Sequence, residues 1–405
     1  MESSPKIAVV GFSVRAATQC ATRQGFEVIA VDMCSDRDLV SECKDHYQLN
    51  APDWPAALHA RYPNVPILLA GGMENRPQLV EECQARGLVS GADAIPLRAM
   101  RSLENWAVWA LASELGWPVT LRTQSEIQRA DEVYPGFEWL VKPIVGSGGN
   151  AITEWTKKER QAPASFYPTA TSYIQQRLKG EPIGVTFLSS PFGSIVVGAT
   201  ASWQPESSFE GGPKYAYRGS YGPIDLSSDQ LLKLRNFANL VGAQTELLGL
   251  WQADFLRSGD KLTLLEINPR WSASMDILDV SLLIPMVQHH YLCICSLLNN
   301  ERFLEIASTY LERSASPNNV LLGKLIVYAP KPFVVAPNQS DKWWSQRWSG
   351  PSSLAAKGHL YADIPNPSTA ISVGEPVLTV MATERTPGAL MAELQRGKME
   401  VLDEL

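Results

Sequence analysis

Three polar side chains in the segment 250–270 have the types and the spacing of a metal site. The segment predicts a β-hairpin, because two apolar runs flank a turn signal at residues 258–260. Glu266 and Asn268 are two residues apart and therefore point to one face of a strand. With an odd-length loop at residues 258–260, Asp254 falls on that face as well, opposite or diagonal to Glu266. Two carboxylates and an amide oxygen suit Mg²⁺. The alternative is an exposed, acid-lined strand face.

A glycine-rich loop upstream is a candidate for binding phosphate. Residues 138–143 predict a strand with Lys142 near its end, and residues 151–155 predict a second strand. The loop between them contains four small residues, namely Gly146, Ser147, Gly148 and Gly149. Glycine permits positive φ and close approach, so backbone N–H groups of such a loop can contact phosphate oxygens, and Lys142 adds a positive charge. The Walker pattern is absent, since no Gly-Lys-Ser/Thr and no helix follow. The alternative is a hairpin with a mobile tip.

Two further segments are candidates for binding the rest of a nucleotide and a substrate. Residues 173–178 predict a strand whose backbone can present donors and acceptors to an adenine edge, and Glu181 follows with a carboxylate for ribose hydroxyls. The loop 209–223 is rich in glycine, tyrosine and basic residues, and long ordered loops often carry function. Lys214 and Arg218 in this loop are candidates for holding an anionic substrate. The alternative is a surface loop with solvated charges.

The elements that position these residues begin with an α/β pattern. Two buried strands flank a helix in the first 32 residues, which is a βαβ start. The dinucleotide fingerprint Gly-x-Gly-x-x-Gly is incomplete, because the relevant positions after Gly11 are Ser13 and Ala16. This disfavours a dinucleotide site, although Asp32 stands where a ribose-binding acid would lie.

The remaining pattern predicts further modules. We expect a helix over residues 98–115, an amphipathic helix over residues 227–241, a β-rich tail after Asn299, and a last helix over residues 386–396 that ends at Gly397. The expected modules are an N-terminal α/β domain (1–97), a linker helix with a small subdomain that carries the glycine loop (98–195), a large subdomain with the metal site (196–300), and a β-rich C-terminal module (301–405).

Composition excludes several classes of function. The chain has 405 residues, 45% hydrophobic and 19% charged, with a net charge of −7 and no basic run, which argues against nucleic-acid binding. No apolar run is long enough to span a membrane, and the N-terminus lacks the layout of a signal peptide, so we expect a cytoplasmic protein. Six scattered cysteines without a Cys-x-x-Cys pair indicate reduced thiols. The adjacent His289 and His290 lie on an expected helix and cannot both face one ion.

Taken in order, these motifs resemble the ATP-grasp superfamily of carboxylate ligases over about residues 1–295. The matching motifs are Val-Lys142-Pro with Gly-Ser-Gly-Gly149, Gln175-Gln176 with Gly180-Glu181, Asp254-Phe, and Glu266-Ile-Asn268-Pro-Arg270. Within the superfamily, the chain is similar to predicted ATP-dependent carboligases related to biotin carboxylase. The residues that carry this likeness are Gly-Phe-Ser13-Val-Arg15, Tyr217-x-Gly219-Ser, and the tail's Ala-Asp-Ile-Pro and Gly-Glu-Pro. Some relatives act in tetrahydromethanopterin and methanofuran one-carbon metabolism, including ligases that join glutamate to an amine.

The resemblance implies a fold of mixed α/β and α+β character. It has an N-terminal open α/β (pre-ATP-grasp) domain, two antiparallel-sheet subdomains that clasp ATP, and a β-rich C-terminal module. It also implies roles for the candidate residues. Lys142 would bind the α- and β-phosphates under the closing loop 146–149, and Arg270 would lie beside the γ-phosphate or the acyl phosphate. Mg²⁺, or Mn²⁺ in its place, would bind Asp254, Glu266 and Asn268.

The adenosine end follows the family less closely. The residues implied there are Gln175, Gln176, Leu178 and Glu181. Many ATP-grasp enzymes have a further lysine near the linker helix, where this chain offers Arg98 and Arg101. The ribose-binding acid often lies one residue further along, at Pro182.

These residues together predict an ATP-dependent carboxylate–amine ligase that forms an amide through an acyl phosphate. The carboxylate and amine are expected to be small molecules, with glutamate or another amino acid added to a small molecule or cofactor precursor. Specificity is expected in the loop around Lys214, Tyr217 and Arg218, after Arg270, and in the turn that contains Ser13 and Arg15. The alternatives are an ATP-binding regulatory protein without catalysis and a dinucleotide-dependent oxidoreductase. The oligomeric state is open, with a homodimer as one candidate assembly.

Overall fold

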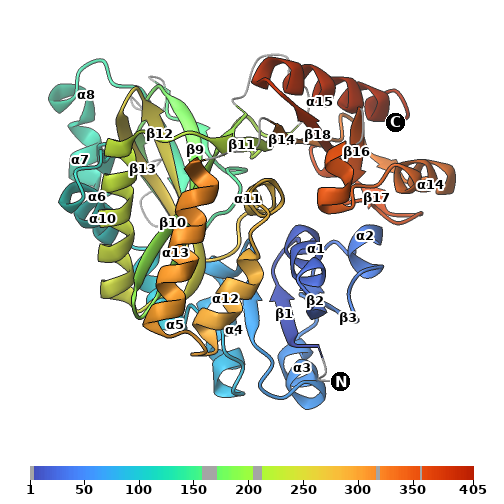
Figure 1. The fold of residues 1–405 in the computed structure, drawn as a ribbon. Helices are drawn as coiled ribbons and strands as arrows, with labels where there is room; N and C mark the ends of the chain where they lie inside the picture. Colours follow the sequence, from blue (N-terminus) through green and yellow to red (C-terminus); the bar gives the residue numbers. More distant parts are fainter. Residues whose placement is uncertain (1–3, 157–170, 204–211, 316–319, 356–357) are drawn as a thin grey trace.

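The computed structural model describes residues 4–156, 171–203, 212–315, 320–355 and 358–405. The N-terminal part is a parallel α/β sheet in the order β3-β2-β1-β4, as the alternating strand and helix pattern predicts (Figure 1). Its elements are β1 (Lys6–Val10), α1 (Arg15–Arg23), β2 (Glu27–Asp32), α2 (Arg37–Val40), β3 (Asp45–Gln48), α3 (Trp54–Arg61), β4 (Ile67–Leu69), the short helix η1 (Met73–Asn75) and α4 (Pro77–Ala85). The expected open α/β domain is thus present.

Two helices, rather than one, follow this sheet. The helix expected over residues 98–115 is divided into α5 (Ala94–Met100) and α6 (Leu103–Ala112). Ser102 causes the break, because its hydroxyl accepts a hydrogen bond from the Asn105 backbone N–H and so caps a new helix. The expected apolar stripe is nevertheless buried, since Trp106 and Trp109 are 3% and 2% exposed.

A small antiparallel sheet carries the glycine loop. Its strand order is β5-β8-β6-β7, and two short helices lie beside it. The elements are β5 (Thr120–Leu121), α7 (Gln124–Gln128), α8 (Ala130–Val133), β6 (Trp139–Pro143), β7 (Thr153–Glu154) and β8 (Ser172–Gln176). A separate small core with Trp139 and Ile174 at its centre holds this sheet together.

A second, eight-stranded sheet forms the body of the molecule, in the order β13-β12-β9-β10-β11-β14-β18-β16. Its first five strands are β9 (Glu181–Ser190), β10 (Gly193–Ser202), β11 (Ser220–Ile224), β12 (Gly249–Ser258) and β13 (Lys261–Asn268), and its helices are α10 (Ser228–Thr245), α11 (Met275–Leu282), α12 (Met286–Ile294) and α13 (Asn300–Ala315). Successive residues of a strand point to opposite faces. Accordingly, Phe187 packs with Phe237 of α10, while Leu188 joins the core formed with α11, α12 and α13.

The C-terminal segment extends this same sheet. Its elements are β14 (Leu321–Tyr328), β15 (Phe333–Val334), α14 (Pro337–Ser345), the short helix η3 (Gly350–Ala355), β16 (His359–Ala362), β17 (Ala370–Ile371), β18 (Pro376–Glu384) and α15 (Pro387–Leu402). β14 pairs with β11, so the sheet continues across residue 300, and the C-terminal segment lies beside α2 of the N-terminal part (Figure 1). The module boundaries at residues 97, 195 and 300 stay predictions.

The last helix continues beyond its expected end. α15 runs past Gly397, which therefore does not terminate it. Glycine instead allows close packing at this position, because a Cβ added there would lie 2.6 Å from both His359 Cδ2 and Val380 Cγ1.

Within the described ranges, no single helix is long and apolar enough to cross a membrane. α11 and α12 reach that length and hydropathy only together, as a pair that is bent by 112° at its junction.

The contact at Gly397 yields a stability prediction. Gly397→Ala should lower the free energy of unfolding by about 1–3 kcal/mol, because the overpacking outweighs the better helix propensity of alanine. Gly388→Ala in the same helix is the control, since no atom lies within 4 Å of a Cβ added there. It should be neutral or stabilise the protein by up to about 1 kcal/mol. Urea denaturation measures both variants, and equal effects would contradict the packing role.

Candidate functional site

The hairpin of β12 and β13 places the two acidic candidates opposite each other, but not through an odd-length loop. Ser258 pairs with Lys261, so the turn has an even number of residues, Gly259 and Asp260. Continued without interruption, that register would place Asp254 opposite Leu265 and turn Glu266 to the other face. A β-bulge between the pairs Phe255–Leu264 and Asp254–Glu266 shifts the register by one residue. The predicted convergence is therefore present, and its cause is a bulge at Leu265.

Hydrogen bonds hold the acidic group in place. The Asn268 side-chain N–H donates to one oxygen of Asp254 at 2.9 Å, and that of Gln252 donates to the other oxygen at 2.8 Å. Burial and the negative charge of Glu266 raise the pKa of Asp254 to about 6, against the lowering effect of these two hydrogen bonds and of Arg270. A carboxylate whose charge is disfavoured in this way suits a cation, so the residues present fit a divalent metal ion.

Glu266 is oriented by a residue outside the hairpin. Arg101, in the connection between α5 and α6, donates through Nη1 to Glu266 Oε1 at 2.7 Å and to the backbone carbonyl of Ile267 at 3.3 Å. Arg101 is one of the two arginines that this chain has where many ATP-grasp enzymes have a further lysine. The other candidate there, Arg98, pairs instead with Glu81 on the surface.

Lys142 lies at the end of β6, close to the same acidic group. Its ammonium donates to Gln175 Oε1 at 2.7 Å. Burial lowers the pKa of Lys142, while the charges of Glu266 and Asp254 act in the opposite direction. The strand pairing of β6 with β8 sets Lys142 and Gln175 on neighbouring strands, and this explains their contact.

The glycine loop is held close to the residues 213–217. Gly148 and Gly149 have φ values of +66° and +74°, which side chains rarely adopt. A Cβ on Gly149 would lie 2.0 Å from the carbonyl oxygen of Tyr215, and the Tyr217 N–H donates to the Gly148 carbonyl at 2.8 Å. Glycine is thus needed here for close backbone approach, as a loop that covers phosphates requires.

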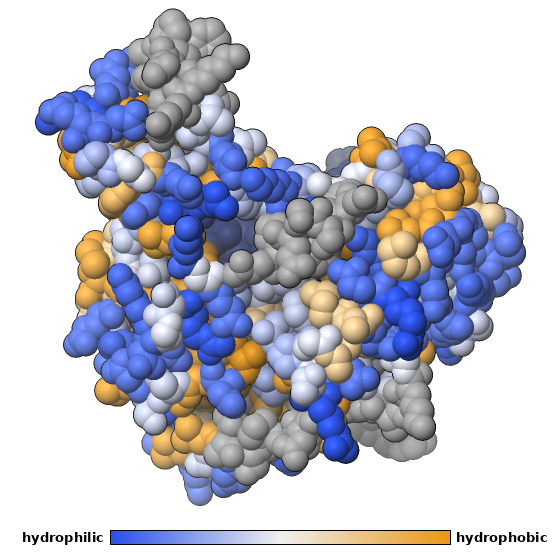
Figure 2. Space-filling view, turned by 90° about the horizontal axis from the view of Figure 1, so that it is seen from above, coloured by the Kyte–Doolittle hydropathy of each residue, from blue (hydrophilic) through white to orange (hydrophobic). Residues whose placement is uncertain are grey.

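One cavity of about 650 Å³ brings most of the candidates together. The predicted residues that line it are Ser13, Arg15, Lys142, Ser147, Gly148, Gly149, Gln175, Gln176, Leu178, Tyr217, Arg218, Asp254, Glu266, Asn268 and Arg270. The surface view in Figure 2 shows a recess in a largely hydrophilic face of the molecule. Residues distant in sequence therefore share one space that is large enough for a nucleotide and a small substrate.

Three candidates do not line this cavity. Lys214 is exposed and pairs with Glu154 at 2.6 Å. Glu181 accepts hydrogen bonds from Arg257 at 2.6 and 2.8 Å and contributes to a separate surface depression. Gly146 lies beyond the lining, where its carbonyl accepts a hydrogen bond from Asn75. Part of the expected substrate loop, residues 209–211, lies outside the described residues.

Arg270 stands between the metal candidates and the rest of the cavity. Its guanidinium donates to Glu74 at 2.9 Å and to the Asn268 side-chain oxygen at 3.1 Å. Glu74 is buried, which by itself would raise its pKa, but Arg270, with help from Arg101, lowers it. Sequence reasoning missed Glu74, since nothing in the turn after β4 indicates that it would meet β13.

The far end of the cavity is polar and is built from three parts of the chain. Arg15 donates to Asp363 at 2.9 Å, and Lys324 of β14 pairs with Asp276 at 2.6 Å. Asp363 and Lys324 also line the cavity. Asp363 belongs to the tail motif Ala-Asp-Ile-Pro, but nothing in the sequence indicated that this motif or Lys324 would reach the cavity. Gln252, by contrast, could have been predicted from the sequence. It lies two residues from Asp254 on the same strand, so both side chains point to one face.

Comparison with known proteins agrees with this geometry. Residues 110–274 match the family model described as an ATP-grasp domain. The chain has an ATP-grasp fold. No curated protein matches the sequence.

Solved ATP-grasp structures match the chain over nearly its whole length. The L-amino acid ligase of Bacillus licheniformis matches with a TM-score of 0.67 and 13% identity, covering 100% of this chain and 98% of that one. Carboxyaminoimidazole ribonucleotide synthase of Aspergillus clavatus, complexed with ATP, matches at 0.68 and 12%, covering 100% of each chain. The biotin carboxylase domain of the 2-oxoglutarate carboxylase of Hydrogenobacter thermophilus, in complex with MgADP and bicarbonate, matches at 0.69 and 11%, covering 99% and 90%. At such identities the likeness shows the fold alone.

The raised pKa of Asp254 predicts how stability depends on pH. The native state holds this proton more tightly than the unfolded chain, where the pKa is 3.8. Without metal, the stabilising contribution of Asp254 should therefore be present below about pH 4 and be lost as the pH rises towards 6, a change on the order of 1–3 kcal/mol.

Urea denaturation in EDTA measures this loss, which should vanish in Asp254→Asn and persist in Asp260→Asn at the exposed turn. Added Mg²⁺ should restore stability above about pH 6, since it binds the ionised form. A pH profile identical in Asp254→Asn and the unsubstituted protein would contradict the shifted pKa.

Proposed function

We propose that this protein is an ATP-dependent carboxylate–amine ligase that forms an amide through an acyl phosphate. The observation that carries the proposal is the convergence of Asp254, Glu266, Asn268 and Lys142 on one cavity beside Arg270. The ATP-grasp fold supports the nucleotide part of the proposal. The likeness to a ligase and to carboxylases supports phosphoryl transfer to a carboxylate or to bicarbonate.

The chemistry begins with a carboxylate, which is a poor electrophile. An oxygen of the substrate carboxylate attacks the γ-phosphorus, the bond to the bridging oxygen breaks, and ADP leaves. The amine nitrogen then attacks the carbonyl carbon of the acyl phosphate, inorganic phosphate leaves, and the nitrogen loses a proton to complete the amide. Neither step needs a covalent protein nucleophile, so the protein acts by positioning and electrostatics.

The residues of the cavity have distinct tasks in this scheme. Asp254, Glu266 and Asn268 would hold a magnesium ion, which would supply positive charge against the phosphates. Lys142 provides a positive charge near the α- and β-phosphates. Arg270 is fixed by Glu74 and Asn268, so its guanidinium is already in place to stabilise charge on the transferring group.

The glycine loop and the far end of the cavity complete the scheme. Loop 146–149 covers the phosphates, and its closure excludes water from an intermediate that hydrolyses readily. Arg15, Tyr217 and Arg218 lie at the far end, where we place the acid and amine substrates. Lys214, which pairs with Glu154, and Glu181, which pairs with Arg257, have no role in this scheme.

The direct test measures ADP and phosphate release with Mg²⁺-ATP. The panel pairs amino acids, glutamate included, with amines and one-carbon cofactor precursors, and bicarbonate is included as an alternative acid. A ligase should release ADP and phosphate only when acid and amine are both present and should yield the amide by mass spectrometry. Nucleotide binding without turnover on the whole panel would favour an ATP-binding regulatory protein.

Glu266→Gln tests the metal-binding role. It should lower turnover by at least about 10²-fold while the fold is kept, since the amide retains the shape but not the charge of a metal ligand. Asp260→Asn, at the exposed turn of the same hairpin, is the control and should retain full activity. Near-normal turnover of Glu266→Gln would remove Glu266 from the proposed metal site.

Lys142→Ala tests the phosphate-binding role. It should weaken ATP binding by about tenfold or more, because a charge-assisted hydrogen bond contributes roughly 1.5–3 kcal/mol. Calorimetric titration measures the affinity, and Lys261→Ala, an exposed lysine on the neighbouring hairpin, should leave it unchanged. An ATP affinity that is equal in Lys142→Ala and the unsubstituted protein would contradict the assignment.

A further inference from the structure

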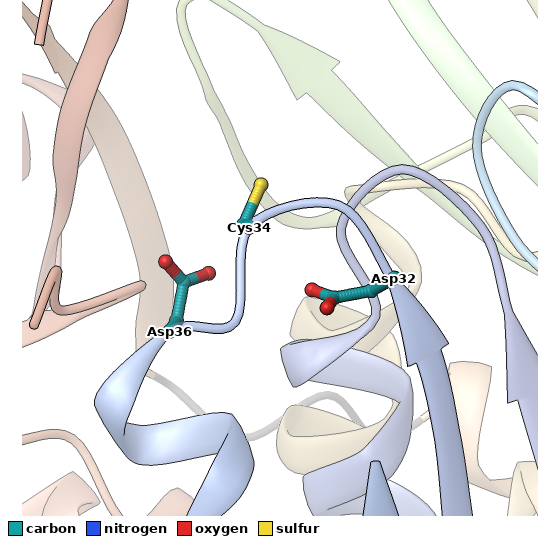
Figure 3. A group of neighbouring side chains, drawn as sticks. All are labelled: Asp32, Cys34 and Asp36. Atoms are coloured by element: carbon teal, nitrogen blue, oxygen red, sulfur yellow. The ribbon is translucent and has the colours of Figure 1, made fainter. Parts of the chain in front are cut away.

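A second cluster of metal-binding side chains lies outside the nucleotide site. Asp32, Cys34 and Asp36 occupy the turn between β2 and α2, and one oxygen or sulfur atom of each lies within 4.8 Å of the others. Figure 3 shows the three side chains grouped around this turn, with the Asp32 side chain pointing across it toward Asp36. The sequence predicts no metal site here, since Asp32 stands where a ribose-binding acid would lie and Cys34 and Asp36 match no metal-binding motif.

The Asp36 carboxylate is the observation that points to a ligand. Its side chain is 8% exposed, yet it caps no backbone N–H of α2, and among the described residues no hydrogen bond or ion pair to it is present. Ionising a carboxyl group that is largely buried and has no protein partner is costly. Asp32, Asp38 and Asp363 add further negative charge around it. Arg15, whose positive charge acts on Asp36, is already paired with Asp363 and Asp38.

The surroundings are organised as they would be around a metal ligand. His46 Nε2 lies 2.7 Å from Asp32 Oδ1, and the backbone N–H of Ser35 also donates to Asp32 at 3.1 Å. Such partners orient a ligating carboxylate. Cys34 reaches the surface, which gives an ion access, and its thiol lies 3.5 Å from the Phe12 carbonyl oxygen.

We propose that Asp32, Cys34 and Asp36 bind a divalent cation of borderline softness, with Zn²⁺ as the best fit. The mixed oxygen and sulfur donor set excludes Mg²⁺ and Ca²⁺ as preferred ions and suits Zn²⁺ with a water in the fourth position. With bond lengths of about 2.0–2.3 Å, tetrahedral ligand atoms lie about 3.3–3.8 Å apart, so only a modest contraction of the turn is needed. Binding replaces the thiol proton of Cys34, which passes to solvent.

The position of the site suggests what the ion does. Phe12, whose carbonyl faces Cys34, and Asp363, whose charge acts on Asp36, both line the nucleotide cavity. The turn also contacts the C-terminal segment, since the Asn366 side chain donates to the Ser35 carbonyl at 2.7 Å. The ion would thus fix the junction at which the N-terminal and C-terminal parts form the far end of the cavity, with no part in the reaction itself.

Cobalt titration of the metal-free, full-length protein tests the proposal. Co²⁺ should produce a thiolate-to-cobalt charge-transfer band that saturates at one equivalent and is abolished by added Zn²⁺. The oxygen-only site of Asp254, Glu266 and Asn268 cannot give this band, so Glu266→Gln should retain it. Cys34→Ser should lose it, and Cys295→Ser, which changes a partly buried cysteine elsewhere in the chain, should retain it.

A second variant keeps the test independent of the thiol. Asp36→Asn should weaken Co²⁺ binding by about tenfold or more, because the amide cannot supply the negative charge of a carboxylate ligand. The absence of a charge-transfer band in the unsubstituted protein would overturn the proposal. So would a band that persists in Cys34→Ser, or an unchanged Co²⁺ affinity in Asp36→Asn.

Discussion

The repulsion between Asp254 and Glu266 is the constraint on which the rest of this site depends. A β-bulge at Leu265 turns both carboxylates to the same face of a buried hairpin, where burial raises the pKa of Asp254 to about 6. Such a pair destabilises the protein unless positive charge is brought near it. The surrounding structure supplies that charge through Lys142, Arg101 and Arg270, each from a different part of the chain.

Two of these cations, Lys142 and Arg270, are in turn held by partners outside the acidic pair. Lys142 donates to Gln175, and Arg270 donates to the buried Glu74 of the N-terminal part. Because Lys142 and Arg270 are fixed by groups outside the hairpin, while Arg101 pairs directly with Glu266, the site is preorganised for a multiply charged ligand rather than fully neutralised within itself. This is the electrostatic pattern expected where anionic phosphates and a divalent cation are to be bound together.

The C-terminal segment belongs to the same arrangement. Its strands β14, β18 and β16 continue the large sheet, and Lys324 and Asp363 line the far end of the cavity. Lys324 pairs with Asp276 at the start of α11, and Asp363 pairs with Arg15 of α1. The segment therefore closes the cavity at the end where a substrate would lie, and it does so by ion pairs to both of the other large parts of the chain.

The sequence by itself determined the chemistry and its order along the chain. Residue type and two-residue spacing were enough to find Glu266 and Asn268, and glycine content was enough to find the loop after Lys142, because strand periodicity and glycine conformation are local properties. Only the tertiary structure decided which groups meet. The bulge at Leu265 has no sequence signal. Packing between distant elements brings Glu74 to Arg270, Arg101 to Glu266, and Asp363 to the cavity. Lys214 and Glu181 were also candidates from the sequence, yet ion pairs with Glu154 and Arg257 hold them outside the cavity lining.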